Sequence, residues 1–130
     1  MVKAIRIHKP GGPDAMVYED VQIKPPGPGE AYVRQTAIGV NYIDTYHRSG
    51  LYPLPMPALI GREAAAVVES VGPGVTEFAA GDRVTYCTGS LGSYSEQRIA
   101  PVERLLKLPD AITDPQAPPM RLNGLTVQYM

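Results

Sequence analysis

The sequence predicts a mainly β domain, a barrel-like set of about six to eight short strands with small helices at its edge. One observation is that apolar and polar residues alternate with period two in several short segments, as they do in strands. Another is that 14 prolines and 13 glycines are spread along all 130 residues. Even spreading favours frequent turns between short strands over a flexible linker.

Seven segments have the composition of strands, and Pro- or Gly-containing turns separate most of them. These segments are 2–8, 16–23, 31–40, 64–71, 82–87, 93–100 and 105–108. The three prolines between Tyr52 and Pro57 predict an extended loop. A tight loop, 88–92, joins the fifth and sixth strands.

A short helix is predicted over 41–49. Asn41 is a suitable N-cap, Asp44 places a carboxylate in the first turn, and Gly50 supplies the stop. Asp44 and Arg48 lie four residues apart, so we expect them to pair on the helix surface.

A second helix is predicted to begin at Thr113, which is a plausible N-cap, with Asp114 and Pro115 in its first turn. Pro118 and Pro119 should break or kink it. A further helical piece is expected over 120–130.

Composition argues against several classes of function. The net charge is −1 and no basic block occurs, so nucleic acid is not an expected partner. Cys87 is the only cysteine, which rules out an intrachain disulfide and a thiolate cluster. No apolar run approaches the ~18 residues of a membrane span, and the first residues do not resemble a secretory signal. We therefore expect a cytoplasmic protein that does not bind membranes.

Residues 39–53, which read Gly-Val-Asn-Tyr-Ile-Asp-Thr-Tyr-His-Arg-Ser-Gly-Leu-Tyr-Pro, resemble a segment of the NADPH:quinone oxidoreductases. These zeta-crystallin-like enzymes are zinc-free members of the medium-chain dehydrogenase/reductase superfamily. The resemblance continues through nearly the whole chain, notably at Gly61-x-Glu63-Ala64-Ala65, Ala80-Gly81-Asp82-Arg83-Val84, Gly92-Ser93-Tyr94-Ser95 and Gly124-Leu125-Thr126. It implies that residues 1–130 form a GroES-like, partly open β-barrel catalytic domain. Residues 113–130 would begin the connection to a Rossmann domain.

That Rossmann domain is not expected within these 130 residues. The nearest glycine cluster, Gly72-Pro73-Gly74, has the first two glycines of a dinucleotide fingerprint, but Glu77 stands where the third must be. We interpret this cluster as a turn between strands. The sequence is therefore expected to be a catalytic domain on its own, inactive without its partner domain.

The resemblance also bears on metal binding, because zinc alcohol dehydrogenases share this fold. Their cysteine and histidine ligands would fall at Asn41 and Arg62 in this sequence. An amide is a poor zinc ligand and a guanidinium is not a ligand, so no zinc site is expected. His8 and His47 are expected to be surface residues.

The resemblance implies NADPH as cofactor, with a quinone as acceptor. It places Tyr46 and Thr126 on the nicotinamide side. The Asn41 amide is suited to hold the carboxamide or ribose of the cofactor, and Asp44 is expected among the cofactor-binding residues. Tyr52, on the proline-rich loop, is suited to stack on a flat quinone, so Tyr46 and Tyr52 are the expected catalytic residues. Plain alternatives exist: Asn41 as a helix cap, and each tyrosine as a packing residue. Glu63 is expected either at the floor of the cleft or as a buried, hydrogen-bonded carboxylate.

Three functions remain open at this stage. The first is a quinone reductase, whose parent protein would be a homodimer through the missing domain. The second is an enoyl or alkenal reductase of the same superfamily, and the third is a non-enzymatic GroES-like binding module. The residues that would distinguish NADPH from NADH lie on the missing domain.

Overall fold

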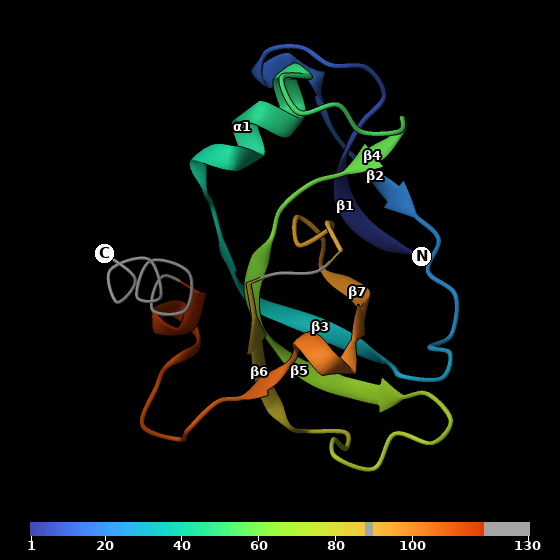
Figure 1. Cartoon of the computed structure of the whole chain (residues 1–130), viewed down its shortest axis with the longest axis vertical. Coiled ribbons are helices and arrows are strands. Elements are labelled where there is room, and N and C mark those ends of the chain that lie inside the picture. The colour runs from blue at the N-terminus through green and yellow to red at the C-terminus, as the bar shows by residue number, and fades with distance from the viewer. Residues whose placement is uncertain (88–89, 119–130) are drawn as a thin grey trace.

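The computed structural model describes residues 1–87 and 90–118, so the expected helical piece over 120–130 and Thr126 lie outside the described residues. The strands form two antiparallel sheets that do not close into a barrel, consistent with the partly open barrel that was expected (Figure 1). The smaller sheet has the order β2-β1-β4, with bounds Met16–Val21, Val2–Ile7 and Ala58–Leu59. The larger has the order β7-β3-β5-β6-β8, with bounds Gln97–Pro101, Glu30–Gly39, Glu63–Val71, Arg83–Tyr86 and Leu106–Lys107.

The predicted helix is confirmed as α1, Tyr42–Ser49, with Asn41 at its N-cap. Gly50 ends it at φ 86°, the left-handed conformation that favours glycine at a helix C-terminus. Three short 3-10 helices complete the described elements: η1 Pro13–Ala15, η2 Val102–Arg104 and η3 Asp114–Gln116. No helix within residues 1–87 and 90–118 is long and apolar enough to cross a membrane.

The main core lies against the larger sheet and is built largely from small side chains. Its buried members are Ala31, Val33, Ala64, Ala66, Val68, Val84, Tyr86, Ala100 and Leu105. A second, smaller cluster of Val2, Ala4 and Val21 lies under the smaller sheet.

The strand predicted over 93–100 is wrong in its first half, because only Gln97–Pro101 is strand β7. Residues 92–96 instead cross between the sheets. Ile5 N donates to Tyr94 O (2.8 Å), Tyr94 N to Ile60 O (3.1 Å) and Gln35 N to Glu96 O (2.8 Å). This crossing segment therefore bonds to residues of both sheets and cannot follow a single ladder. The short strand β4 also begins directly after the predicted proline-rich loop, where no strand was expected.

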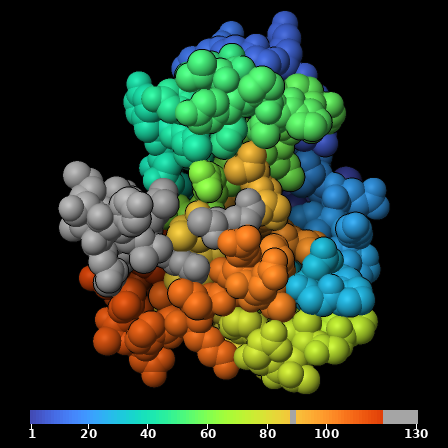
Figure 2. Space-filling model, in the orientation of Figure 1, coloured from blue at the N-terminus to red at the C-terminus, as the bar shows by residue number. Residues whose placement is uncertain are grey.

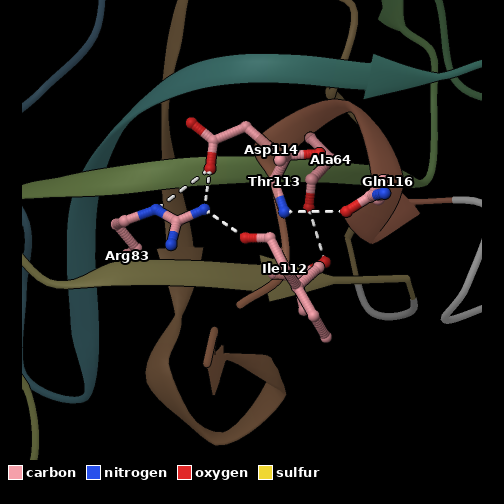
Figure 3. Close-up of polar contacts among 7 residues, drawn as sticks. Ala64, Arg83, Ile112, Thr113, Asp114 and Gln116 are labelled. Atoms are coloured by element: carbon pink, nitrogen blue, oxygen red, sulfur yellow. Dashed lines mark hydrogen bonds and ion pairs between the residues drawn. The ribbon is translucent and has the colours of Figure 1, made fainter. Parts of the chain in front are cut away.

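The helix predicted from Thr113 begins as η3, and a side-chain network holds it against the sheet (Figure 3). Arg83 Nη2 donates to Asp114 Oδ1 (2.5 Å) and to Ile112 O (2.7 Å). Thr113 N donates to Gln116 Oε1 (3.0 Å), which supports the predicted N-cap. The Arg83 guanidinium lowers the pKa of the Asp114 carboxyl. Residues 112–116 are thereby fixed to β6.

Candidate functional site

The candidate site begins where β3 ends and α1 starts, opposite the first residue of β5. Gly39 pairs with Glu63 in the β3–β5 ladder, and Asn41 follows two residues later. Asn41 Nδ2 donates to Glu63 Oε1 (2.9 Å), and Glu63 is only 2% exposed. Asn41 thus occupies the predicted N-cap position while its amide binds a buried carboxylate. Of the two expectations for Glu63, the structure shows the buried, hydrogen-bonded one.

Gly39 makes this arrangement possible. A Cβ atom built on Gly39 would overlap the side chain of Glu63. Any larger residue would therefore push Glu63 away from Asn41. Glycine is required at position 39 because the Glu63 side chain lies so close to the backbone there. Backbone conformation is not the reason, since the φ of Gly39 lies outside the left-handed region.

Asp44 is 2% exposed and faces the protein interior. Its Oδ2 accepts hydrogen bonds from Asn41 N (3.0 Å) and from Tyr94 OH (2.6 Å). The expected Asp44–Arg48 pair is wrong: Arg48 Nε instead donates to Gly11 O (3.3 Å). The reason is that Tyr94 offers Asp44 a buried donor, whereas the helix surface offers only a solvated pair of small net value.

Tyr94 is a site residue for which the sequence suggested no role. It lies in the crossing segment, next to Gly61, whose φ of 99° and closeness to the Tyr94 ring leave no room for a side chain. Burial, together with the hydrogen bond to Asp44, raises the pKa of the Tyr94 phenol. In the sequence, the only indication of a role for Tyr94 was its place in the Gly92–Ser95 motif, which does not identify its hydrogen-bond partner.

Three tyrosines form a cluster on α1 and the loop after it. The Tyr46 and Tyr52 rings lie 5.3 Å apart in an edge-to-face arrangement, and the Tyr42 and Tyr46 rings are equally close. Tyr52 N also donates to Tyr46 O (3.2 Å). Tyr52 is 48% exposed and Tyr42 is 75% exposed, so the cluster presents aromatic surface to the outside. The structure therefore brings together the two tyrosines singled out from the sequence, and adds Tyr42.

A largely apolar pocket of about 390 Å³ adjoins the start of the helix. Val40, the residue before Asn41, lines it, as do Ile38 from β3, Ile5 from β1 and Tyr94. Tyr94 therefore lines this pocket and also donates the hydrogen bond to Asp44. Val40, two residues before α1, thus lines the pocket, while Tyr42, the first residue of α1, belongs to the tyrosine cluster.

The described residues offer no evident metal centre. Across 1–87 and 90–118, no three His, Cys, Asp or Glu side chains gather in a metal-binding group. His8 is exposed and lies 2.7 Å from Glu19 Oε1, as expected for a surface residue. The same expectation for His47 is wrong, because this residue is 7% exposed and packs beside Tyr52 with the ring centres 6.2 Å apart.

The geometry and the sequence place the chain in a known family. Residues 27–110 match the alcohol dehydrogenase GroES-like domain, and the chain belongs to that family. The matched range contains all five strands of the larger sheet and strand β4 of the smaller one.

Among particular proteins, the chain is similar to 2-haloacrylate reductase of a Burkholderia species, at 50% identity over all of this chain and 41% of that protein. It is 51% identical to the solved quinone oxidoreductase of Pseudomonas syringae pv. Tomato DC3000, with a TM-score of 0.95 over 99% of this chain and 40% of that one. The Escherichia coli quinone oxidoreductase, solved in complex with NADPH, is 44% identical, with a TM-score of 0.94 over 98% of this chain and 39% of that one. The chain thus spans about two fifths of the length of these relatives.

Proposed function

We propose that these residues form the catalytic-side portion of an NADPH-dependent quinone oxidoreductase that works without zinc. The observation that carries the proposal is the ring contact between Tyr46 on α1 and the exposed Tyr52, together with the hydrogen bond from Asn41, the N-cap of the same helix, to Glu63. Such a surface suits a flat, aromatic acceptor next to a polar group that can orient a nicotinamide. The similarity to quinone oxidoreductases over almost the whole chain supports the same conclusion.

The residues present fit the nicotinamide end of the cofactor. Asp44 Oδ1 is buried and has no hydrogen-bond partner among the described residues. A carboxamide N–H is the kind of donor that would satisfy it. We infer that Asn41, Asp44 and Tyr46 hold this end, with Thr126, which lies outside the described residues, as a fourth contact. When bound, NADPH supplies the hydride.

The protein's own contribution is to position and desolvate. Tyr46 and Tyr52 would contact the acceptor ring edge-on or by stacking and exclude water from it. Glu63 would fix the Asn41 amide, and the Tyr94 hydroxyl would fix Asp44. A quinone is a good electron acceptor whose reduced oxygens can be protonated by water, so no Lewis acid is required. The proposal includes a cytoplasmic homodimer that assembles through the rest of the protein.

A second candidate is reduction of an activated C=C bond. The 50% identity to a 2-haloacrylate reductase, which covers the whole of this chain, is the observation that favours it. The same tyrosine pair would then contact a smaller, non-aromatic acceptor.

The test uses a two-domain protein in which these 130 residues precede the cofactor-binding part of the E. coli relative. We expect NADPH-dependent reduction of a benzoquinone, with Tyr46→Ala and Tyr52→Ala each raising KM for quinone or lowering kcat about tenfold. Leu106→Ala, an exposed apolar residue on β8, is the control and should match the unsubstituted protein. If both tyrosine variants stay within about twofold, the cluster has only a packing role.

The acceptor is decided by comparing benzoquinone with 2-chloroacrylate in the same assay. The proposed function requires a higher kcat/KM for benzoquinone. A higher kcat/KM for 2-chloroacrylate would establish the second candidate instead. Reduction of neither, in a protein that binds NADPH, would leave the binding-module interpretation.

A further inference from the structure

Arg98, on strand β7, is a charged residue buried among neutral groups. It is 6% exposed. Its Nη2 donates to Ser90 O (3.0 Å) and Ser90 Oγ (2.6 Å), and its Nε donates to Ile99 O (3.1 Å). The guanidinium carbon lies 5.2 Å from the centre of the Tyr86 ring. Carbonyls, a hydroxyl and a π-face thus satisfy much of its hydrogen-bonding capacity without neutralising its charge.

In the part of the chain that the structure describes, no carboxylate side chain pairs with this buried charge. None of the ion pairs formed within residues 1–87 and 90–118 includes Arg98. The sequence has no Asp or Glu at positions 88–89 or 119–130, so those residues cannot supply an acidic side chain. Burying an ion without a counter-ion is unfavourable, because the charge loses its hydration. The fold therefore maintains a positive charge at a place where an anion would lower the free energy.

The hydrogen-bond geometry leaves the guanidinium with spare donor capacity. Its Nη1 carries two N–H groups, and among the described residues its acceptor is Tyr86 OH at 3.5 Å, the outer limit of a hydrogen bond. Tyr86 OH itself donates to Gln35 Oε1. Arg98 can thus form a further, stronger hydrogen bond without giving up those it makes to Ser90 and Ile99.

Arg98 lines a pocket of about 250 Å³ between β7 and the end of β2. Polar donors face it from both sides: Lys24 and Gln22 follow β2, and Ser90 and Gln97 accompany Arg98. The remaining lining residues are Val21, Ile23, Leu59, Leu91, Gly92, Ser95 and Ile99. The lining contains two cations and no acidic residue, although the chain as a whole has a net charge of −1. In Figure 2 the orange residues of β7 lie on the visible face beside the cyan segment that precedes β3.

We propose that this pocket binds a dianionic phosphate group, either inorganic phosphate or the phosphoryl group of a small metabolite. Arg98 supplies its charge and the spare N–H groups of Nη1, and Lys24, which is exposed, supplies a second charge. Two positive charges match a dianion better than a carboxylate with one charge. Ser90 and Gln97 add neutral donors. Asn41, Tyr46 and Tyr52 do not line the pocket, so the proposal is independent of the quinone reductase function.

The test is a titration of the ¹⁵N-labelled chain with inorganic phosphate, followed by NMR at constant ionic strength and mildly alkaline pH. We expect saturable shifts of the amides at Ser90, Gly92 and 97–99. Lys24→Gln should weaken binding about threefold, since a solvent-exposed charge contributes up to roughly 1 kcal/mol. The control is Lys9→Gln, an exposed lysine that does not line the pocket, and its affinity should equal that of the unsubstituted chain.

Arg98→Lys, which keeps the charge and loses the guanidinium N–H groups, should weaken phosphate binding more than Lys24→Gln. The same spectra show whether each variant is folded. If Arg98→Lys does not fold, the surface variant Lys24→Gln alone tests whether this pocket binds phosphate. Acetate and glycerol 3-phosphate complete the series. Tighter binding of glycerol 3-phosphate than of phosphate would identify a metabolite phosphoryl group, and the reverse would identify free phosphate. Shifts that never saturate, equal effects of Lys24→Gln and Lys9→Gln, or acetate binding as tight as phosphate would each overturn the proposal.

Discussion

The Tyr94 hydroxyl is the group that connects the crossing segment to the start of α1. Because it donates to the buried Asp44 carboxylate, Tyr94→Phe leaves that carboxylate with one fewer donor. We expect the free energy of unfolding to fall by about 1–2 kcal/mol, measured by urea denaturation. Tyr18→Phe, at a tyrosine that is 65% exposed, should change it by less than about 0.5 kcal/mol. Equal stability of the two variants would show that the Tyr94–Asp44 bond contributes nothing net.

The same phenol should make stability depend on alkaline pH. Burial raises the pKa of Tyr94, and the hydrogen bond to Asp44 raises it further; burial also raises the pKa of Tyr86. In the unfolded chain a tyrosine loses its proton near pH 10. Between that pH and the higher pKa of the folded state, only the unfolded chain is deprotonated, so the stabilising contribution present at lower pH is progressively lost.

We therefore expect the free energy of unfolding to decrease as the pH rises above about 10, and to decrease less steeply in Tyr94→Phe. Urea denaturation at a series of pH values measures both slopes. Lysines titrate in the same pH range, but they are the same in Tyr94→Phe and in the unsubstituted chain. Their contribution therefore cancels when the two slopes are compared. Parallel profiles would mean that Tyr94 has the same pKa in the folded and unfolded chains.

Sequence reasoning succeeded for residues whose neighbours are local and failed for those whose neighbours are distant. Asn41, Tyr46 and Tyr52 lie on one helix and its following loop, so the motif already implied that they are close together. The partner of Asp44 is 50 residues away along the chain, and helical spacing suggested Arg48 instead. Likewise, nothing in the sequence around Arg98 indicated that its charge is buried without a counter-ion.

The junction of β3, β5 and α1 depends on Gly39. An alanine there would place its Cβ within the volume of the Glu63 side chain. We expect Gly39→Ala to lower the free energy of unfolding by about 1–3 kcal/mol, the usual cost of overpacking. Chemical denaturation provides the measurement. The matched control is Gly12→Ala, whose Cβ would meet only the end of the Asp14 side chain.

In the proposed two-domain enzyme, Gly39→Ala should also raise KM for NADPH, because the displaced Glu63 no longer fixes the Asn41 amide. Gly12→Ala should leave KM unchanged. A Gly39→Ala protein with unaltered stability and KM would show that Glu63 moves aside without consequence.

Elements with local start and stop signals were predictable, and elements defined by pairing were not. Helix α1 follows from Asn41 and Gly50 alone, and both ends were correct. The segment from Ser93 to Glu96 has strand-like alternation, yet it bonds to residues of both sheets and belongs to neither ladder. The two-residue strand β4 exists because β1 offers a free edge to Ala58 and Leu59, which is a tertiary property.

The two sheets differ in what holds them together. The larger sheet has its own buried core, whereas the smaller one buries only a few side chains and depends on the crossing segment. The backbone bonds of Ile5, Ile60 and Gln35 to that segment join the sheets into one unit. The family resemblance implied this architecture, but alternation of polar and apolar residues alone left the number of sheets undetermined.

The 130-residue chain alone should fold cooperatively yet lack quinone reductase activity. Folding is expected because both sheets, their connecting segment and the helix caps lie within these residues, and a domain of this size buries enough surface for independent stability. Activity is expected to fail because the chain spans about two fifths of the relatives' length and contains no dinucleotide fingerprint. Asn41, Asp44 and Tyr46 would contact only the nicotinamide end of NADPH. Without anchors for the diphosphate and adenosine, the binding energy that orients the ring over the acceptor is lost.

Two measurements test this pair of expectations separately. A thermal melt should show one cooperative transition, and its absence would contradict the folding half. Calorimetric titration with NADPH should show no submillimolar affinity, and benzoquinone should not be reduced. Adding the cofactor-binding part of the E. coli relative should restore both affinity and turnover, because it supplies the remote anchors. Turnover by the 130-residue chain together with submillimolar NADPH affinity would contradict the activity half. It would show that these residues alone bind the whole cofactor and orient its nicotinamide.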